Sequence, residues 1–318
     1  MPPDPPAATR PAPPVLTVDD LRVAFPGAGE AVRCVSFTLR PGEVLALVGE
    51  SGAGKSLTAR ALLGLTPREA RVTGTIRLHG QPVTTDDLGH RISLVPQDSL
   101  AALSPVHRVG DQLALAALSL DPRLSRREAR DSATAALRSV GLDTAQAAAY
   151  PHALSGGQRQ RAVIAMATLG APDVLVADEP TTALDPDVRA HILGLLRSTG
   201  ATVLLVTHDL DVVRGHADRV AVMYGGRIAE TGPAAAVLQD PRAPYTAALV
   251  GAVPTALTPH RSRLPVVPGD APAPGEPASG CAFAPRCAYA EDACRTTVPA
   301  LIRLPGDREL ACPVRESV

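Results

Sequence analysis

Four short runs of apolar residues, separated by segments of helical period, constrain the fold of this chain most strongly. The runs occupy residues 44–48, 93–95, 174–177 and 203–206. A continuous apolar run of this length is typical of a β-strand that is buried on both faces. Strands of this kind that alternate with helices predict an α/β fold built on a parallel sheet.

The segments around these runs predict further parts of the fold. Alternating apolar residues at 16–25 and 35–39 indicate half-buried strands. Residues 220–230 contain a strand pattern, a Gly-Gly turn and a second strand pattern, which predicts a hairpin. Between about 97 and 150 the chain is rich in Ala, Leu and Arg and poor in strand patterns. We therefore expect a helical insert there.

The length and charge of the chain exclude several classes of protein. Its 318 residues predict one large domain with an appendage, and its net charge of −1 does not fit a dedicated nucleic-acid binder. The longest apolar runs fall short of the roughly 18 residues that a membrane-spanning helix needs. Residues 1–14 are rich in Pro and Ala, which predicts a disordered tail, and they lack the features of a secretory signal. We therefore expect the protein to stay in the cytoplasm.

Residues 49–56 match the P-loop pattern G-x-x-x-x-G-K-[ST]. Its glycines let backbone N–H groups surround phosphate oxygens, and the following helix adds the positive end of its dipole. Lys55, the only lysine in the chain, would place its ammonium at the β- and γ-phosphates, and the Ser56 hydroxyl would bind Mg²⁺. A buried strand before the loop and a helix after it favour this interpretation over a chance Gly-rich turn. The predicted ATP-binding residues of the loop are Gly49, Glu50, Ser51, Gly52, Ala53, Gly54, Lys55, Ser56 and Leu57.

A pair of carboxylates follows the buried run at 174–177. Ligands of parallel sheets bind at the carboxyl ends of the strands, which is where Asp178 and Glu179 stand. Asp178 is placed to hold Mg²⁺, and Glu179 is placed to polarise an attacking water. Alone, such a pair is more typical of solvated side chains at a strand end, but together with the P-loop it predicts a catalytic site.

The segment Leu-Ser-Gly-Gly-Gln at 154–158 precedes a helical pattern that starts at Arg161. Ser155 is a good N-cap residue, and Gly156 and Gly157 leave backbone N–H groups uncovered. Taken alone, the segment is explained by a plain capped helix start. Beside a P-loop, it can equally form a second anion-binding helix N-terminus.

This segment resembles the signature motif of ATP-binding cassette (ABC) ATPases, and the resemblance covers residues 15 to about 250. It implies an α/β, P-loop ABC ATPase cassette with a RecA-like parallel sheet core, an antiparallel β subdomain and a helical subdomain. In that family two ATP molecules lie between two cassettes. The residues that would reach the ATP on a partner's P-loop are Ser155, Gly156, Gly157 and Gln158.

Other motifs of the family follow in the expected order. Gln97 resembles the Q-loop glutamine, which contacts Mg²⁺ and water, and Asp185 lies in a segment that resembles the D-loop. His208 resembles the switch histidine at the γ-phosphate, and Phe25 lies in the region of the aromatic residue that stacks on adenine. The predicted catalytic residues are thus Glu179 and His208, and the predicted Mg²⁺ ligands are Ser56, Gln97 and Asp178.

Several segments are similar to the oligopeptide and dipeptide importer branch of this family. They occupy residues 150–157, 177–185, 244–246, 267–269 and 280–287. The resemblance implies an ATP-hydrolysing subunit that energises a membrane importer for peptides from the cytoplasmic face of the membrane, as a peripheral protein. Its implied partners are a second ATPase subunit in a heterodimer, two integral membrane permeases and, indirectly, a solute-binding protein.

Three other functions remain open at this point. An importer of nickel or another small solute belongs to the same branch. A soluble ABC ATPase that acts on DNA or ribosomes usually has two cassettes in one chain, a long coiled-coil insert or inserted zinc modules, which do not occur in this sequence. An iron–sulfur redox sensor, in which ATP is secondary, fits poorly with intact Glu179 and His208.

Residues 251–318 are predicted to form a Pro-rich linker and an irregular C-terminal extension. Four cysteines of the extension are separated by five, six and seventeen residues, and they are Cys281, Cys287, Cys294 and Cys312. Disulfides are disfavoured in the cytosol, and structural zinc sites usually use closer pairs. A [4Fe–4S] cluster takes four thiolates, and the resemblance implies such a cluster in some members of the branch. Zn²⁺ and unligated or redox-labile thiols remain the alternatives, while Cys34 is predicted to be a small buried hydrophobe.

Overall fold

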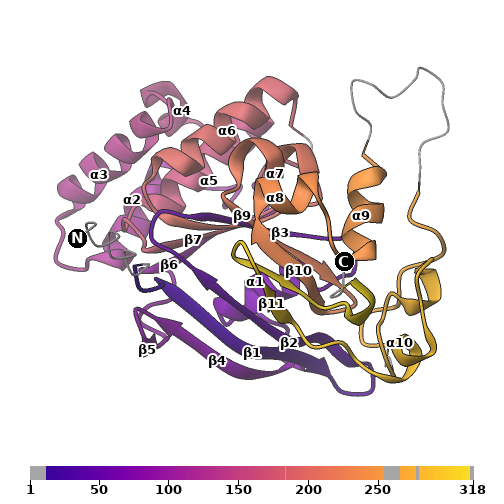
Figure 1. The fold of residues 1–318 in the computed structure, drawn as a ribbon. Coiled ribbons are helices and arrows are strands. Elements are labelled where there is room, and N and C mark those ends of the chain that lie inside the picture. Colours follow the sequence, from indigo (N-terminus) through magenta and orange to yellow (C-terminus); the bar gives the residue numbers. More distant parts are fainter. Residues whose placement is uncertain (1–11, 183, 254–265, 277–278, 316–318) are drawn as a thin grey trace, which may run out of the picture.

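The structure, a computed structural model, contains two sheets that pack against each other, with helices around the larger one (Figure 1). The described residues are 12–182, 184–253, 266–276 and 279–315. Most of the predicted N-terminal tail and much of the predicted linker therefore lie outside the described residues.

The larger sheet carries the four buried runs. Its strands are, in chain order, β3 (Val44–Val48), β6 (Ile92–Val95), β7 (Val174–Asp178), β8 (Thr202–Val206), β9 (Arg219–Tyr224), β10 (Arg227–Pro233), β11 (Ile302–Leu304) and β12 (Arg308–Leu310). Their order across the sheet is β11-β12-β10-β9-β3-β8-β7-β6, and the neighbours from β9 to β6 pair in parallel. This arrangement confirms the predicted parallel sheet. The predicted hairpin is also confirmed, since β9 and β10 pair antiparallel.

The smaller sheet is antiparallel. It consists of β1 (Leu16–Phe25), β2 (Gly29–Leu39), β4 (Arg71–Leu78) and β5 (Gln81–Pro82). Their order is β2-β1-β4-β5, and every neighbouring pair is antiparallel. Leu16 and Val18 of β1 are buried while Thr17 between them is half-buried, which agrees with the alternation seen in the sequence.

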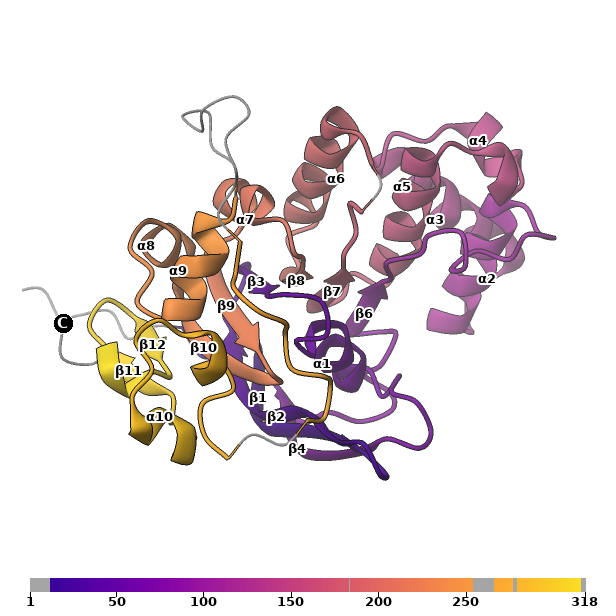
Figure 2. The same cartoon turned by 90° about the vertical axis from the view of Figure 1, so that its right-hand side faces the viewer.

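Helices cover the larger sheet and form the insert. The α-helices are α1 (Lys55–Leu62), α2 (Val109–Leu120), α3 (Arg126–Ser139), α4 (Thr144–Ala148), α5 (Gly156–Thr168), α6 (Pro186–Ser198), α7 (Leu210–His216), α8 (Ala234–Gln239), α9 (Pro244–Gly251) and α10 (Asp292–Thr296). Short 3₁₀ helices are η1 (Pro151–Ala153), η2 (Ala284–Arg286) and η3 (Pro313–Arg315). The predicted helical insert is confirmed as α2, α3 and α4, which stand together beyond the β6 edge of the sheet (Figure 2).

The core is organised around β3, whose five residues are all buried. Successive side chains of a strand point to opposite faces. Leu45 and Leu47 accordingly pack with the smaller sheet in one hydrophobic cluster. Ala46 and Val48 pack with Tyr245 of α9 in another cluster on the opposite face. β3 therefore connects the two sheets to the C-terminal helices.

The C-terminal extension is more regular than the sequence predicts. β12 pairs with β10, and β11 pairs with β12, so the extension adds two antiparallel strands to the larger sheet. This pairing uses N–H and C=O groups that would otherwise leave β10 as an exposed edge. The sequence did not predict this hairpin, because three-residue strands are too short to show an alternating pattern.

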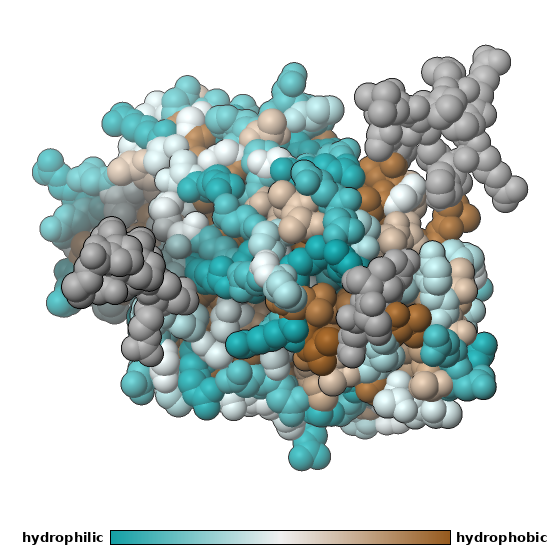
Figure 3. Space-filling model, in the orientation of Figure 1, coloured by the Kyte–Doolittle hydropathy of each residue, from teal (hydrophilic) through white to brown (hydrophobic). Residues whose placement is uncertain are grey.

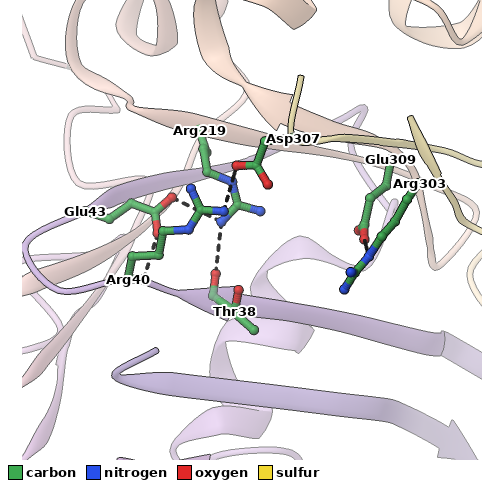
Figure 4. Close-up of polar contacts among 7 residues, drawn as sticks. All are labelled: Thr38, Arg40, Glu43, Arg219, Arg303, Asp307 and Glu309. Atoms are coloured by element: carbon green, nitrogen blue, oxygen red, sulfur yellow. Dashed lines mark hydrogen bonds and ion pairs between the residues drawn. The ribbon is translucent and has the colours of Figure 1, made fainter. Parts of the chain in front are cut away.

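Charged side chains connect this hairpin to the body of the protein (Figure 4). Asp307, in the turn between β11 and β12, accepts a hydrogen bond from Arg40 at 2.6 Å. Arg219 donates to Glu43 at 3.1 Å and to the main-chain oxygen of Thr38 at 3.3 Å. Glu43 in turn accepts from the main-chain nitrogen of Arg40 at 2.7 Å. The link therefore joins the turn after β2, the start of β9 and the hairpin.

The surface on the side seen in Figure 3 is mostly polar, with apolar residues gathered near α9 and in a second group below it, near β10 and β11. Leu249 and Val250 of this helix are half-buried and pack against the cluster below it. None of the helices in the described ranges has the length and apolar character needed to span a lipid bilayer.

We expect Arg308→Met to destabilise the protein by about 3 kcal/mol, because removing one partner of a buried ion pair leaves the other charge without compensation. Arg308 donates to Glu230 at 2.5 Å, and the Glu230 side chain is only 1% exposed. Urea denaturation followed by circular dichroism measures the loss.

Arg303→Met is the matched control in the same hairpin. Arg303 pairs with Glu309 at 3.4 Å, but its side chain is 91% exposed, so the change should cost less than about 1 kcal/mol. An equally small loss for Arg308→Met would mean that the main-chain amides of Arg242 and Ala243, which also donate to Glu230, are enough to stabilise its carboxylate.

Candidate nucleotide-binding site

The predicted P-loop connects the end of β3 to α1, as expected. Gly52 and Gly54 have positive φ angles of 79° and 101°, a conformation that residues with a Cβ rarely adopt. At Gly49 a Cβ would lie 2.2 Å from the main-chain oxygen of Met223. The loop therefore needs its glycines, and the space they leave forms a cradle of the kind that surrounds phosphate oxygens.

Lys55 begins α1 with its side chain buried under this loop. Its Nζ donates to the main-chain oxygens of Gly49 at 2.9 Å and Glu50 at 3.0 Å. Burial lowers the pKa of Lys55, and the negative charges of Glu179 and Asp178 oppose that shift. Lys55 as a residue is only 6% exposed, and its ammonium beside the cradle is suited to bind a polyphosphate anion.

Ser56 and Asp178 lie together beside the loop. The Ser56 hydroxyl donates to Oδ1 of Asp178 at 2.8 Å, and Asp178 at the end of β7 is 3% exposed. Burial raises the pKa of Asp178, with the hydrogen bond from Ser56 acting in the opposite direction. A hydroxyl and a carboxylate are hard oxygen donors, so this pair fits the chemistry of Mg²⁺.

Glu179 is held by groups from three other positions. Its carboxylate accepts from Nε2 of Gln97 at 3.1 Å and from the hydroxyl of Thr182 at 3.0 Å. Nδ1 of His208 lies 3.1 Å from its other oxygen. Its main-chain N–H donates to Val206, the last residue of β8, while its φ of 47° is unusual for a residue other than glycine. Such backbone strain, of about 1–3 kcal/mol, concentrates at functional sites.

Lys55, Ser56, Gln97, Glu179 and His208 share one cleft. Its lining residues are Ala31, Ser51, Gly52, Gly54, Lys55, Ser56, Leu57, Gln97, Glu179, His208 and Pro274. Sequence reasoning missed Ala31, Thr182 and Pro274, and the sequence holds no signal that would mark them out. Phe25, at the end of β1, packs against the hydrophobic core and is not one of the lining residues of this cleft, so its role at adenine stays a prediction.

The signature-like segment lies elsewhere. Ser155 is exposed and caps α5: its hydroxyl accepts from the main-chain nitrogen of Gln158, whose side chain accepts in return from the nitrogen of Ser155. Asp185 caps the neighbouring helix α6 by accepting from Val188 at 3.0 Å. A Cβ on Gly157 would come within 2.7 Å of Val188, so α5 and α6 begin side by side. Neither Ser155 nor Asp185 is one of the residues lining the P-loop cleft.

The four cysteines of the extension line one pocket, together with apolar residues such as Tyr245 and Phe283. Burial raises the pKa of Cys281. Across the described ranges, however, the structure contains no group of three or more His, Cys, Asp or Glu side chains that could hold a metal ion. The structure thus brings the four thiols to one place without arranging them as ligands.

Cys34 differs from its predicted role as a small buried hydrophobe. It is half-buried on β2, has a φ of 51°, and accepts a hydrogen bond from Arg22. The positive φ occurs within an irregular stretch of the pairing between β1 and β2, so the simple strand alternation does not apply there.

The parallel sheet, the P-loop between β3 and α1, and the acidic pair at the end of β7 define an ATP-binding cassette. The ABC transporter family matches residues 32–182, and the family described as the oligopeptide/dipeptide transporter C-terminal region matches residues 229–294. Among solved structures, cbiO1 from Clostridium perfringens, part of an ABC transporter complex, is similar with a TM-score of 0.63 and 28% identity, over 71% of this chain and 91% of that one.

Curated relatives agree with this class. A putative peptide import ATP-binding protein of Brucella abortus is 43% identical over 95% of both chains. The oligopeptide transport ATP-binding protein OppD of Mycobacterium tuberculosis is 45% identical over 94% of this chain, which spans about half (52%) of its length. The chain belongs to the ABC transporter family of ATP-binding proteins.

Lys55→Ala should weaken ATP binding at least tenfold, because a charge-assisted contact to phosphate contributes about 1.5–3 kcal/mol. Titration with a fluorescent ATP analogue measures the affinity. Arg126→Ala is the control, since it removes an exposed cation at the start of α3, in the helical insert.

The single lysine allows a second measurement. An amine-reactive reagent can modify only Lys55 among the side chains, and peptide mapping locates the product. Bound ATP should protect Lys55 from modification; equal labelling with and without ATP would show that the nucleotide does not contact this ammonium.

Proposed function

We propose that this chain is the ATP-hydrolysing subunit of a membrane ABC importer for peptides. The observation that carries the ATPase part is that Lys55, Ser56 and the Glu179–His208 pair line one cleft, with Asp178 hydrogen-bonded to Ser56 beside it. The peptide part is supported by the match to the oligopeptide/dipeptide transporter C-terminal region and by the names of the Brucella and Mycobacterium relatives.

Each residue of the cleft has a role in this proposal. The loop amides and Lys55 bind the β- and γ-phosphates of ATP, and Ser56, Asp178 and Gln97 hold Mg²⁺. The ion, when bound, neutralises negative charge on the phosphates. Glu179 orients the attacking water and accepts its proton, and His208 keeps the Glu179 carboxylate in place.

The proposal includes a second cassette. Ser155 is exposed and lies apart from the P-loop cleft, so its helix N-terminus is free to face the nucleotide of another subunit. We infer a heterodimer with a second ATPase subunit, docked on two integral membrane permeases that receive solute from a solute-binding protein. The chain then works as a peripheral protein on the cytoplasmic face of the membrane, without contact to nucleic acid.

Reconstitution tests the transport part. The chain is combined with its candidate cassette partner and permeases in proteoliposomes, and ATP hydrolysis is measured with a peptide-loaded solute-binding protein. Stimulation by peptide supports the proposal. Stimulation by Ni²⁺ or another small solute, with no response to peptides, would replace peptides as the transported class.

Glu179→Gln should keep ATP binding and lower hydrolysis at least about 100-fold, because the amide is nearly isosteric but cannot accept the proton of the water. Binding is measured by nucleotide titration and hydrolysis by phosphate release in the assembled transporter. Normal hydrolysis by this variant would show that a group other than Glu179 orients the attacking water and accepts its proton.

The proposal also includes a metal centre in the extension. The four cysteines line one pocket, which is the observation that favours a joint role, and a [4Fe–4S] cluster is the first candidate with Zn²⁺ as the alternative. The thiols would have to move closer together to act as ligands, since the present arrangement does not hold a metal ion.

Protein purified without oxygen should be brown and contain about four iron atoms per chain. Cys294→Ser should lower the iron content sharply, because a hydroxyl is a poor replacement for a thiolate, whereas Cys34→Ser should leave it unchanged. One zinc atom per colourless chain would establish the alternative metal. A colourless, metal-free chain with an ordered extension would remove the metal centre from the proposal.

A further inference from the structure

Glu50 places a carboxylate inside a loop that is built to bind an anion. It directly follows Gly49 and precedes the cradle residues, and its side chain is one-quarter exposed. A negative charge at this position would repel a polyphosphate unless another group neutralises it.

The neutralising group comes from the C-terminal extension. Arg286 of η2 donates from one terminal nitrogen to Oε2 of Glu50 at 2.7 Å and from the other to Oε1 at 3.0 Å. This two-pronged pairing is the strongest geometry between a guanidinium and a carboxylate. The Arg286 side chain is only 6% exposed, so water screens the pair weakly.

Groups from both the extension and β9 hold Arg286 in position. Its Nε donates to the main-chain oxygen of Pro268 at 2.6 Å, and a terminal nitrogen donates to the hydroxyl of Tyr224 at 3.0 Å. The guanidinium also lies 5.6 Å from the centre of the Tyr224 ring and 5.8 Å from that of Phe283. Several contacts besides the one with Glu50 therefore fix the position of the Arg286 guanidinium.

Glu50 in turn is tied to the phosphate-binding lysine. Its main-chain N–H donates to the hydroxyl of Tyr245 at 2.9 Å, and its main-chain oxygen accepts from Lys55 at 3.0 Å. Every polar group of Glu50 is thus engaged. A change in the position of Glu50 would move the oxygen that orients the Lys55 ammonium.

We propose that Arg286 is a positioning residue for the P-loop: it neutralises Glu50 and fixes the loop, so that affinity for the polyphosphate of ATP depends on the C-terminal extension. The inference rests on the proposed ATPase function, but it concerns ATP affinity and not the chemical step. It assigns the extension a part in nucleotide binding that does not require a metal in the cysteine pocket.

The test uses the full chain in its assembled complex. Arg286→Gln should raise the Kd and the KM for ATP about tenfold while kcat changes less than about threefold, because the catalytic Glu179 is untouched. Added salt should reduce the defect, since it screens the exposed side of the Glu50 charge. Arg295→Gln, an exposed arginine of the same extension, is the matched control and should leave Kd and KM unchanged.

Rescue separates charge neutralisation from a merely structural role. In the double variant Glu50→Gln/Arg286→Gln the repelling carboxylate is gone, so the affinity should return towards the wild-type value. A defect that the second change does not rescue, or an unchanged Kd in Arg286→Gln, overturns the proposal. Should Arg286→Gln fail to fold, Arg286→Lys keeps a cation beside Glu50: an affinity within about threefold of the wild-type value supports charge neutralisation, whereas a tenfold loss overturns it.

The two proposals can fail separately. A wild-type complex that binds but does not hydrolyse ATP would contradict the proposed ATPase function, and the Kd series would still test Arg286. A wild-type complex that hydrolyses ATP while Arg286→Gln matches it in Kd and KM would contradict only this inference.

Discussion

The burial of β3 on both faces is the constraint on which the rest of the structure depends. One face packs on the smaller sheet through Leu45 and Leu47, and the other packs on α9 through Ala46 and Val48. A strand enclosed in this way has little freedom to shift. Any displacement would leave a cavity on one face and cause steric clashes on the other. The P-loop begins where β3 ends, so the first residue of the loop is held in place by the packed core. This explains how a loop of small residues keeps a defined shape.

Lys55 and Asp178 carry opposite charges and lie near each other at the P-loop. Burial lowers the pKa of Lys55 and raises that of Asp178, which means that the protein interior disfavours both charged forms. Each charge partly relieves the other, and Ser56 adds a hydrogen bond to Asp178. A polyphosphate with Mg²⁺ supplies what each lacks: negative charge for the ammonium and positive charge for the carboxylate. The cleft is therefore chemically suited to bind the two together.

Sequence predicted best those features that local physics determines. Buried runs at 44–48 and 174–177 indicated strands, and the loop at 49–56 required glycine for its positive φ angles. The features that could not be predicted from the sequence depend on contacts between distant segments. The pairing of β12 with β10 and the contact of Arg286 with Glu50, 236 residues away, leave no periodic pattern in either segment. Pro274 also lines the cleft although it is far from the P-loop in the sequence, and the composition of its segment does not predict this contact.

The link between the extension and the P-loop acts in both directions. Arg286 is a buried cation, and without Glu50 its burial would be costly, so the loop stabilises the extension as much as the extension shapes the loop. Linkage then requires that any ligand bound more tightly by the docked arrangement also stabilises docking by the same free energy. Arg286 is followed directly by Cys287, which lines the cysteine pocket together with Tyr224, a neighbour of both. A rearrangement that brings the cysteines together must therefore either preserve the position of Arg286 or alter the P-loop. This couples the pocket to the nucleotide site through Arg286 and also through Tyr245, which lines the pocket and accepts from the main-chain nitrogen of Glu50.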